Sequence, residues 1–313
     1  MPGSPLPSAA PADPLEGVRV WVDGELLGPE ATVRALDHGL TVGDGVFETA
    51  KVVDGRPFAL SRHHDRMDRS LAGLGLEPLD RARLQEGIDA VLGLGTLRHA
   101  RLRYTVTAGL GPLGSDRIPG AATYVVTAME VPPAGPSTTV AVVPWTRNER
   151  GALAGVKSTS YAENVLALCA AKRLGHSEAI LANTAGMLCE GTGTNVFVVT
   201  DGVVRTPALS SGPLAGVTRA LTIEWLREEG VEVVEQELPL SVLADCEELW
   251  VTSSTRDVCA VTRYDVVPPA VLLTGEQVAV PGLTARTLGE GPGPLARVAQ
   301  EVFARRSADD LDP

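Results

Sequence analysis

The segment Gly155–Asn164 contains a lysine whose chemistry stands out in this chain, Lys157. The chain has 27 Lys plus Arg residues, and only three of them are lysines: Lys51, Lys157 and Lys172. A lysine amine can lose its proton when it is desolvated and can then form a Schiff base with a carbonyl compound, whereas a guanidinium stays protonated. A lysine in a chain that otherwise uses arginine is therefore a candidate for amine chemistry.

The three lysines differ in their surroundings. Lys51 lies in an alternating run and Lys172 near the end of an apolar helix, so we expect both to be solvated charges. Lys157 is expected in a loop, because Ser160 and Glu163 form an S-x-x-E capping box, which is typical of a helix N-terminus. An exposed loop lysine would look the same in isolation, so its interpretation depends on the other polar motifs.

Four further motifs carry groups that could hold a phosphorylated cationic ring. Glu190 follows a predicted strand beside glycines, and the helix start at Ala215–Arg219 offers free N–H groups to a phosphate. Arg66 and the hydroxyls of Thr252–Thr255 could bind the same phosphate. Singly, these motifs are also typical of a loop acid, a glycine cap, a solvated arginine and a polar turn. Together with Lys157, they are the groups that pyridoxal 5′-phosphate (PLP) requires.

The segment Gly109–Gly114 matches G-x-G-x-x-G, the glycine pattern of dinucleotide-binding turns. That function requires a helix after the glycines, but a second predicted strand follows here. The pattern therefore indicates a hairpin loop near the site. We find no Walker A, G-x-S-x-G or H-E-x-x-H motif.

Composition restricts the class of protein. The 313 residues are 44% hydrophobic and 21% charged, as in a folded globular protein. A net charge of −12 argues against nucleic-acid and anionic-membrane partners, but it allows a small anionic substrate bound by local donors. The four cysteines form no C-x-x-C pair, which predicts small core residues in a reducing compartment and no metal site. Without a membrane-length apolar run, the expected location is the cytoplasm.

The pattern of elements predicts two domains of the α+β class. Short alternating runs separated by Asp-Gly turns indicate antiparallel strands, and separate helical patterns flank them. A Pro- and Gly-rich run marks the boundary. We predict a disordered leader at 1–17, a small α+β domain at 18–131, a linker at 132–137, a larger domain at 138–306 and a tail at 307–313.

The motifs occur in the order typical of the class IV aminotransferases, the fold type IV PLP enzymes, which the chain resembles from about residue 18 to 290. Gly43–Thr49 resembles the family's G-D-G-x-F-E-T segment, and His63–Met67 resembles H-x-x-R-L. Lys157–Ala167 resembles the segment of the Schiff-base lysine. Glu190–Phe197 resembles E-G-x-x-x-N-x-F, and Leu214–Arg219 resembles L-x-G-I-T-R.

This resemblance implies a two-domain fold type IV enzyme with antiparallel sheets and flanking helices, which binds PLP and forms a homodimer. It implies that Lys157 and Glu190 are catalytic, the first through its amine and the second through the pyridine nitrogen. The residues implied to hold the cofactor are Arg66, Lys157, Tyr161, Glu190, Gly216, Val217, Thr218 and Ser254.

Departures from the family pattern bear on the substrate. Branched-chain-specific aminotransferases carry a Tyr five residues after the lysine, whereas Tyr161 lies four residues after it. Ala108 stands where the D-amino-acid and lyase branches carry an arginine. The remaining candidates for substrate binding are Val42, Arg101, Arg103, Arg117 and Thr255.

The sequences of Val42–Thr49 and of the loop Gly109–Arg117 most resemble those of the aminodeoxychorismate lyase branch. The expected reaction is therefore the conversion of 4-amino-4-deoxychorismate to 4-aminobenzoate and pyruvate, a step toward folate. One alternative is an aminotransferase that acts on branched-chain amino acids, D-amino acids or amines with a 2-oxo acid acceptor. Another is a PLP-binding protein without catalytic activity.

Overall fold

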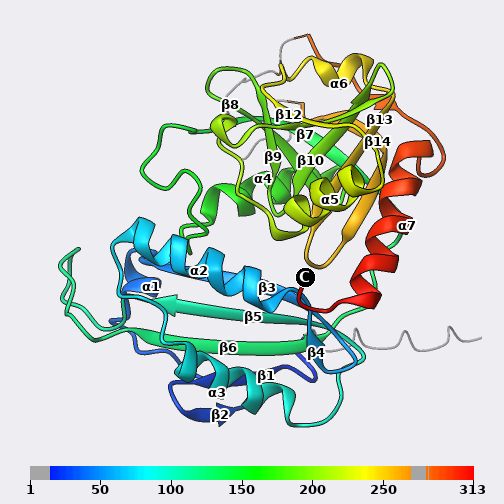
Figure 1. Ribbon diagram of the computed structural model, residues 1–313. Coiled ribbons are helices and arrows are strands. Elements are labelled where there is room, and N and C mark those ends of the chain that lie inside the picture. Colours follow the sequence, from blue (N-terminus) through cyan, green and yellow to red (C-terminus); the bar gives the residue numbers. More distant parts are fainter. Residues whose placement is uncertain (1–14, 269–279, 281) are drawn as a thin grey trace, which may run out of the picture.

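The structure, a computed structural model, describes residues 15–268, 280 and 282–313. It contains two β-sheets with separate sets of helices, one built from the first part of the chain and the other from the remainder (Figure 1). The predicted α+β class is confirmed. The predicted leader lies outside the described residues, apart from a turn at residues 15–17.

The N-terminal sheet has six strands in the order β2-β1-β6-β5-β3-β4, and all its neighbouring strands are antiparallel. Its strands are β1 (Arg19–Val22), β2 (Glu25–Leu27), β3 (Gly45–Val53), β4 (Arg56–Pro57), β5 (His99–Thr107) and β6 (Thr123–Glu130). The helices of this part are α1 (His38–Thr41), α2 (Leu60–Leu74) and α3 (Arg81–Leu92). Met67 and Leu71 of α2 join Leu84 and Ile88 of α3 in one buried core with the sheet.

The register between β3 and β5 determines which side chains face the remainder of the molecule. Thr49 pairs with Arg103, and Lys51 pairs with Arg101. Because side chains alternate between the faces of a strand, these four residues lie on one face of the sheet. Residues on the opposite face, such as Leu102 and Val52, pack into the core with α2 and α3.

The C-terminal sheet has nine strands in the order β12-β11-β10-β13-β14-β7-β8-β9, with β15 paired to β14. The strands are β7 (Ser137–Arg147), β8 (Glu178–Asn183), β9 (Leu188–Gly191), β10 (Asn195–Thr200), β11 (Val203–Pro207), β12 (Val233–Gln236), β13 (Glu248–Ser253), β14 (Asp257–Val266) and β15 (Arg286–Thr287). The associated helices are α4 (Ala162–Arg173), α5 (Val217–Glu228), α6 (Val242–Asp245), α7 (Pro294–Asp309) and the short 3₁₀ helix at Leu209–Ser211.

This second sheet is mixed, whereas the sequence predicted antiparallel strands. The strand β7 is parallel to both β14 and β8, and β11 is parallel to β12. The crossovers between parallel neighbours contain α4 and α5, as parallel pairing requires.

Two helix boundaries correct the sequence prediction. The helix α4 begins at Ala162, and its N-cap Tyr161 makes no side-chain capping bond, so the predicted capping box does not form. The hydroxyl of Ser160 donates instead to the Gly43 carbonyl at 3.0 Å. The helix α7 runs to Asp309 and thus includes residues 307–309 of the predicted tail.

The expectation that Lys51 is a solvated charge was wrong. Its side chain is buried, and its amine forms an ion pair of 2.8 Å with Asp257, which follows the turn between β13 and β14. The amine also lies 4.8 Å from the centre of the Phe58 ring. This pair joins the two sheets, which an alternating sequence pattern cannot reveal.

The four cysteines are free thiols, but they do not share one environment. Three are buried, as the sequence predicted, whereas Cys169 on α4 is exposed. Among residues 15–268, 280 and 282–313, no group of three or more His, Cys, Asp and Glu side chains is arranged to hold a metal ion. No helix in this described part is long and apolar enough to cross a membrane.

Candidate active site

A cavity of about 1040 Å³ brings together residues of both sheets and the loops between them. Apart from Arg117, every residue that the sequence singled out for the cofactor or the substrate lines it. These residues are Val42, Arg66, Arg101, Arg103, Lys157, Tyr161, Glu190, Gly216, Val217, Thr218, Ser254 and Thr255.

The loop of Lys157 is held against the start of β3 by backbone hydrogen bonds. Phe47 N–H donates to the Lys157 carbonyl at 3.0 Å, and Thr159 N–H donates to the Gly45 carbonyl at 2.8 Å. The Lys157 N–H donates to the Ser70 hydroxyl of α2 at 3.2 Å. The chain position of Lys157 is therefore fixed by β3 and by α2.

The amine of Lys157 lies 4.3 Å from the centre of the Phe47 ring. Burial, with the neighbouring positive charge of Arg66, lowers the pKa of Lys157 to about 8, and the negative charges of Glu48 and Glu190 oppose this shift. In the described part of the chain, Nζ forms no ion pair or hydrogen bond. Near neutral pH, this amine is more easily deprotonated than an exposed lysine.

Glu190 lies on β9 with both carboxylate oxygens engaged. Arg147 Nε donates to Oε1 at 3.1 Å, and Leu214 N–H donates to Oε2 at 2.9 Å. Burial raises the pKa of Glu190, while Arg147 and the Leu214 N–H favour the ionised form. The sequence did not point to Arg147, which ends β7 outside any recognised motif.

Tyr161 and Asn164 anchor the start of α4 to the loop after β9. Both side chains donate to the Thr192 carbonyl, at 2.5 Å from the tyrosine hydroxyl and 2.6 Å from the asparagine amide. Arg147 Nη1 donates to Asn164 Oδ1 at 3.1 Å, so the group that holds Glu190 also holds α4. Burial raises the pKa of Tyr161 to about 12.

Arg66 is oriented by a carboxylate that the sequence had not singled out. Its Nε and Nη2 donate to the two oxygens of Glu48 at 2.7 and 2.6 Å, and Nη1 donates to the Ala215 carbonyl at 3.1 Å. His63 Nδ1 lies 2.7 Å from Glu48 Oε2. Arg66 and His63 hold the pKa of Glu48 well below its usual range, although burial acts in the opposite direction.

Gly216 is the N-cap of α5, and the space beside its Cα atom is narrow. A Cβ atom at this position would lie 1.9 Å from Asn195 Oδ1. The first N–H groups of a helix have no intrahelical partner, and Val217 and Thr218 of this first turn line the cavity. These groups could therefore donate to an anion in the cavity.

The hydroxyl-bearing segment Thr252–Thr255, at the end of β13, also lines the cavity. Ser254 Oγ lies 3.4 Å from His63 Nε2. The hydroxyls of Thr194 and Thr252 are buried and unpaired in the described structure, and both residues line the cavity. Unpaired buried hydroxyls indicate that a polar ligand belongs here, so the residues present fit a phosphorylated cofactor.

The structure separates the three candidate arginines. Arg101 and Arg103 line the cavity from β5, and the Arg103 guanidinium lies 3.8 Å from the centre of the Phe47 ring. Arg117 does not line the cavity, because both oxygens of Asp44 bind its guanidinium. The expectation that Arg117 is a free substrate-binding group is therefore not supported by its position.

Comparison with known proteins identifies the class. The family model described as "Amino-transferase class IV" matches residues 45–264. A protein named as a branched-chain-amino-acid aminotransferase in Methanocaldococcus jannaschii is 35% identical over 254 residues, which are 79% of this chain and 88% of that protein. An aminodeoxychorismate lyase of Bacillus subtilis is 29% identical over 262 residues, which are 79% of this chain and 87% of that protein.

Solved structures support the same class. The branched-chain aminotransferase of Thermoproteus uzoniensis, crystallised with norvaline, has a TM-score of 0.77 and 25% identity over 92% of this chain and 93% of that one. The chain belongs to the class IV aminotransferase family and has its fold. It is therefore a PLP-dependent enzyme, and the alternative of a non-catalytic PLP-binding protein is set aside.

Proposed function

We propose that Lys157 and Glu190 are the catalytic residues of a PLP enzyme built around this cavity. Bound PLP supplies an aldehyde that captures amines and a ring that accepts electrons from the adjacent carbon. The buried amine of Lys157, with its pKa lowered to about 8, is suited to hold the aldehyde and to move protons at the reacting carbon. Glu190, whose ionised form is favoured by Arg147 and the Leu214 N–H, is placed to pair with the protonated ring nitrogen.

The phosphate is assigned to a second set of cavity residues. Arg66, the N–H groups of Val217 and Thr218, and the hydroxyl of Ser254 are its donors in this proposal. Support comes from the orientation of Arg66 by Glu48 and from the missing side chain at Gly216. Tyr161, fixed by its bond to the Thr192 carbonyl, lines the cavity and is proposed to contact the cofactor.

For the reaction, we infer aminodeoxychorismate lyase activity, supported chiefly by the pair Arg101 and Arg103. Both guanidiniums lie on the cavity wall, and neither makes an ion pair in the described structure. Two neighbouring cations without an ion pair suit a substrate with two carboxylates, as 4-amino-4-deoxychorismate has. Lys157 would remove the proton beside the amine, after which pyruvate departs and aromatic 4-aminobenzoate remains.

The second candidate is amino transfer to a 2-oxo acid from a branched-chain or D-amino acid. The observation in its favour is the 35% identity to the Methanocaldococcus jannaschii protein, which exceeds the identity to the lyase of Bacillus subtilis. In this reaction, Lys157 would instead move the proton from the substrate to the carbon that bound PLP supplies. The same residues serve both reactions up to the loss of the first proton.

One experiment separates the two candidates. The purified holoenzyme is incubated with 4-amino-4-deoxychorismate alone and, separately, with L-valine or D-alanine plus 2-oxoglutarate. Release of 4-aminobenzoate and pyruvate without an acceptor is the expected result. Formation of glutamate, with 4-amino-4-deoxychorismate unchanged, would replace the lyase proposal with an aminotransferase.

We further propose that the enzyme acts as a cytoplasmic homodimer. Leu40, Val42 and Leu153 are apolar residues that line the cavity and are also exposed, at 68%, 46% and 40%. Apolar side chains around a cavity mouth suit contact with a second copy of the chain. Sedimentation equilibrium of the holoenzyme is expected to give twice the mass of one chain, and a monomer at micromolar concentration would refute the dimer.

A further inference from the structure

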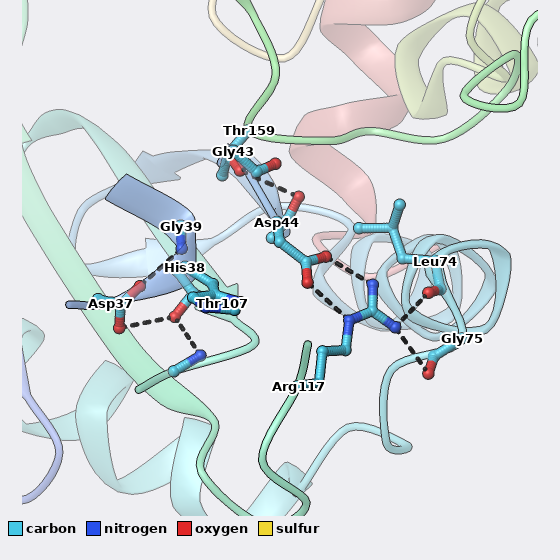
Figure 2. Close-up of polar contacts among 12 residues, drawn as sticks. Asp37, His38, Gly39, Gly43, Asp44, Leu74, Gly75, Thr107, Arg117 and Thr159 are labelled. Atoms are coloured by element: carbon cyan, nitrogen blue, oxygen red, sulfur yellow. Dashed lines mark hydrogen bonds and ion pairs between the residues drawn. The ribbon is translucent and has the colours of Figure 1, made fainter. Parts of the chain in front are cut away.

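Arg117 joins two segments that are distant in the sequence. Its Nε and Nη2 donate to the two carboxylate oxygens of Asp44 at 2.6 and 2.7 Å (Figure 2). Its Nη1 donates to the carbonyls of Leu74 and Gly75 at 2.8 and 3.2 Å. The guanidinium therefore lies between the Gly43–Gly45 turn and the C-terminal end of α2.

The end of α2 is a favourable place for this cation. Gly75 ends the helix in the left-handed conformation, with φ +65°, and carbonyl groups there lack intrahelical partners. A positive charge is stabilised by the negative end of the helix. The same helix carries Arg66 and also Ser70, which binds the backbone of Lys157.

The Gly43–Gly45 turn holds the other side of the Lys157 loop. The carbonyl of Gly43 accepts from the hydroxyls of Thr159 and Ser160 at 2.9 and 3.0 Å, as Figure 2 shows for Thr159. Gly43 has φ +69°, and a Cβ atom there would lie 2.6 Å from Ser160 Oγ. The turn is therefore a tight backbone support, and Asp44 is its only charged residue.

The start of the loop that carries Arg117, directly after β5, is held by a separate set of hydrogen bonds. Thr107 donates its hydroxyl to Asp37 Oδ2 at 3.0 Å and accepts from Gly109 N–H at 3.0 Å (Figure 2). Ala108 N–H donates to the Asp44 carbonyl at 2.9 Å. The loop after β5 thus starts from a fixed point, and Arg117 brings it back to the same turn.

We propose that Arg117 is a positioning residue, which sets the distance between the Lys157 loop and the helix that carries Arg66. It does so by binding Asp44 on one side and the end of α2 on the other. This inference rests on the cofactor site proposed above. It replaces a substrate-binding function for Arg117, because the guanidinium is engaged and does not line the cavity.

The test uses Arg117→Gln, Arg117→Lys, Asp44→Asn and the double variant of Arg117→Gln with Asp44→Asn. Arg81→Gln is the matched control, because Arg81 also forms ion pairs with two carboxylates at α2 but does not reach the Gly43–Gly45 turn. Two quantities are measured on the full chain besides turnover. The first is the Kd for PLP, and the second is the rate at which acetic anhydride labels Lys157 after PLP removal, relative to exposed Lys172.

Arg117→Gln is expected to weaken PLP binding by about tenfold, because small displacements of positioned groups are costly. The labelling rate of Lys157 should change, and Arg117→Lys should restore part of both effects. The double variant should be no worse than either single one, since both break the same link. Arg81→Gln should leave both quantities unchanged.

An increase only in the KM for substrate, with PLP binding and Lys157 labelling unchanged, would show that Arg117 binds substrate and would overturn the proposal. If none of these quantities changes, the ion pair of Arg117 and Asp44 is an ordinary surface contact, and the proposal is also overturned. Changes in PLP binding support the proposal even if the enzyme proves to be an aminotransferase. If Arg117→Gln fails to fold, the decision falls to Arg117→Lys and Asp44→Asn.

Discussion

At the scale of single residues, the lowered pKa of Lys157 predicts how the free energy of unfolding depends on pH. Its pKa is lowered to about 8 in the folded protein, below the usual value of 10.5. Between these two pH values, the unfolded chain binds a proton that the folded chain does not. The contribution of Lys157 to the free energy of unfolding should therefore rise with pH from about 8 to about 10.5.

The measurement is denaturant unfolding of the PLP-free protein and of Lys157→Met at several pH values. The difference in free energy of unfolding, wild type minus variant, should increase across that window. Lys172→Met is the control, since Lys172 is an exposed lysine of α4. A pH-independent difference would mean that the amine of Lys157 remains charged in the folded state.

The variant Glu190→Gln tests the importance of the negative charge of Glu190, because it changes the size of the side chain very little. Glutamine keeps the size and one acceptor oxygen, but it lacks the negative charge that we propose pairs with the ring nitrogen. We expect PLP to remain bound and turnover to fall by about 10² or more, in line with the loss of one positioned electrostatic group. Glu149→Gln, which removes a carboxylate that does not line the cavity, should leave turnover unchanged. A Glu190→Gln enzyme with normal turnover would contradict this role.

The sequence identified the residues with unusual chemistry, but it did not identify their partners. The rarity of lysine and the glycines beside Glu190 pointed to two cavity residues. Arg147 and Glu48 were not assigned functions, because their importance depends on which distant side chain each one binds. An arginine at the end of a strand has no distinctive sequence signal until the fold brings it beside a buried acid.

At the scale of elements, the start of α5 makes a steric prediction. The Cβ atom of Gly216→Ala would lie 1.9 Å from Asn195 Oδ1, which belongs to a buried side chain held by its bond to the Leu214 carbonyl. Either the Asn195 side chain must give up this bond or the start of α5 must shift, at a cost of about 1–3 kcal/mol. The N–H groups assigned to the phosphate would move with the helix, so the Kd for PLP should rise.

Thermal unfolding and PLP titration of Gly216→Ala test this prediction. Gly291→Ala is the matched control, because nothing lies within 4 Å of the added atom and the backbone has no positive φ there. The control should retain the wild-type Kd for PLP. Equal affinity in the two variants would show that close packing at Gly216 does not set the phosphate site.

Element boundaries were predictable where local chemistry decides them. The helix α3 begins after Asp80, whose side chain accepts from Arg83 N–H, so capping alone locates it. The start of α4 was misplaced because the Ser160 hydroxyl binds the distant Gly43 carbonyl. The mixed sheet was missed for a similar reason, since the choice between parallel and antiparallel neighbours is made by the crossovers and not by strand patterns.

At the scale of the whole molecule, the cavity exists only while the two sheets stay together. The buried amine of Lys51 and the partly exposed carboxylate of Asp257 connect them, directly beyond the turn that carries Ser254 and Thr255. Asp257 has φ +51°, a conformation that costs energy for a residue with a side chain. The ion pair therefore stabilises a strained residue beside the proposed phosphate site.

Lys51→Met removes the charge while keeping much of the apolar contact with Phe58. The remaining Asp257 carboxylate is only partly exposed, so we expect the free energy of unfolding to fall by about 2 kcal/mol. Arg62→Met is the matched control, because Arg62 and Glu224 also connect the two halves but are more exposed. Its cost should stay below about 1 kcal/mol. The Kd for PLP should rise in Lys51→Met alone, and equal effects in both variants would show that the buried amine of Lys51 does not position the turn.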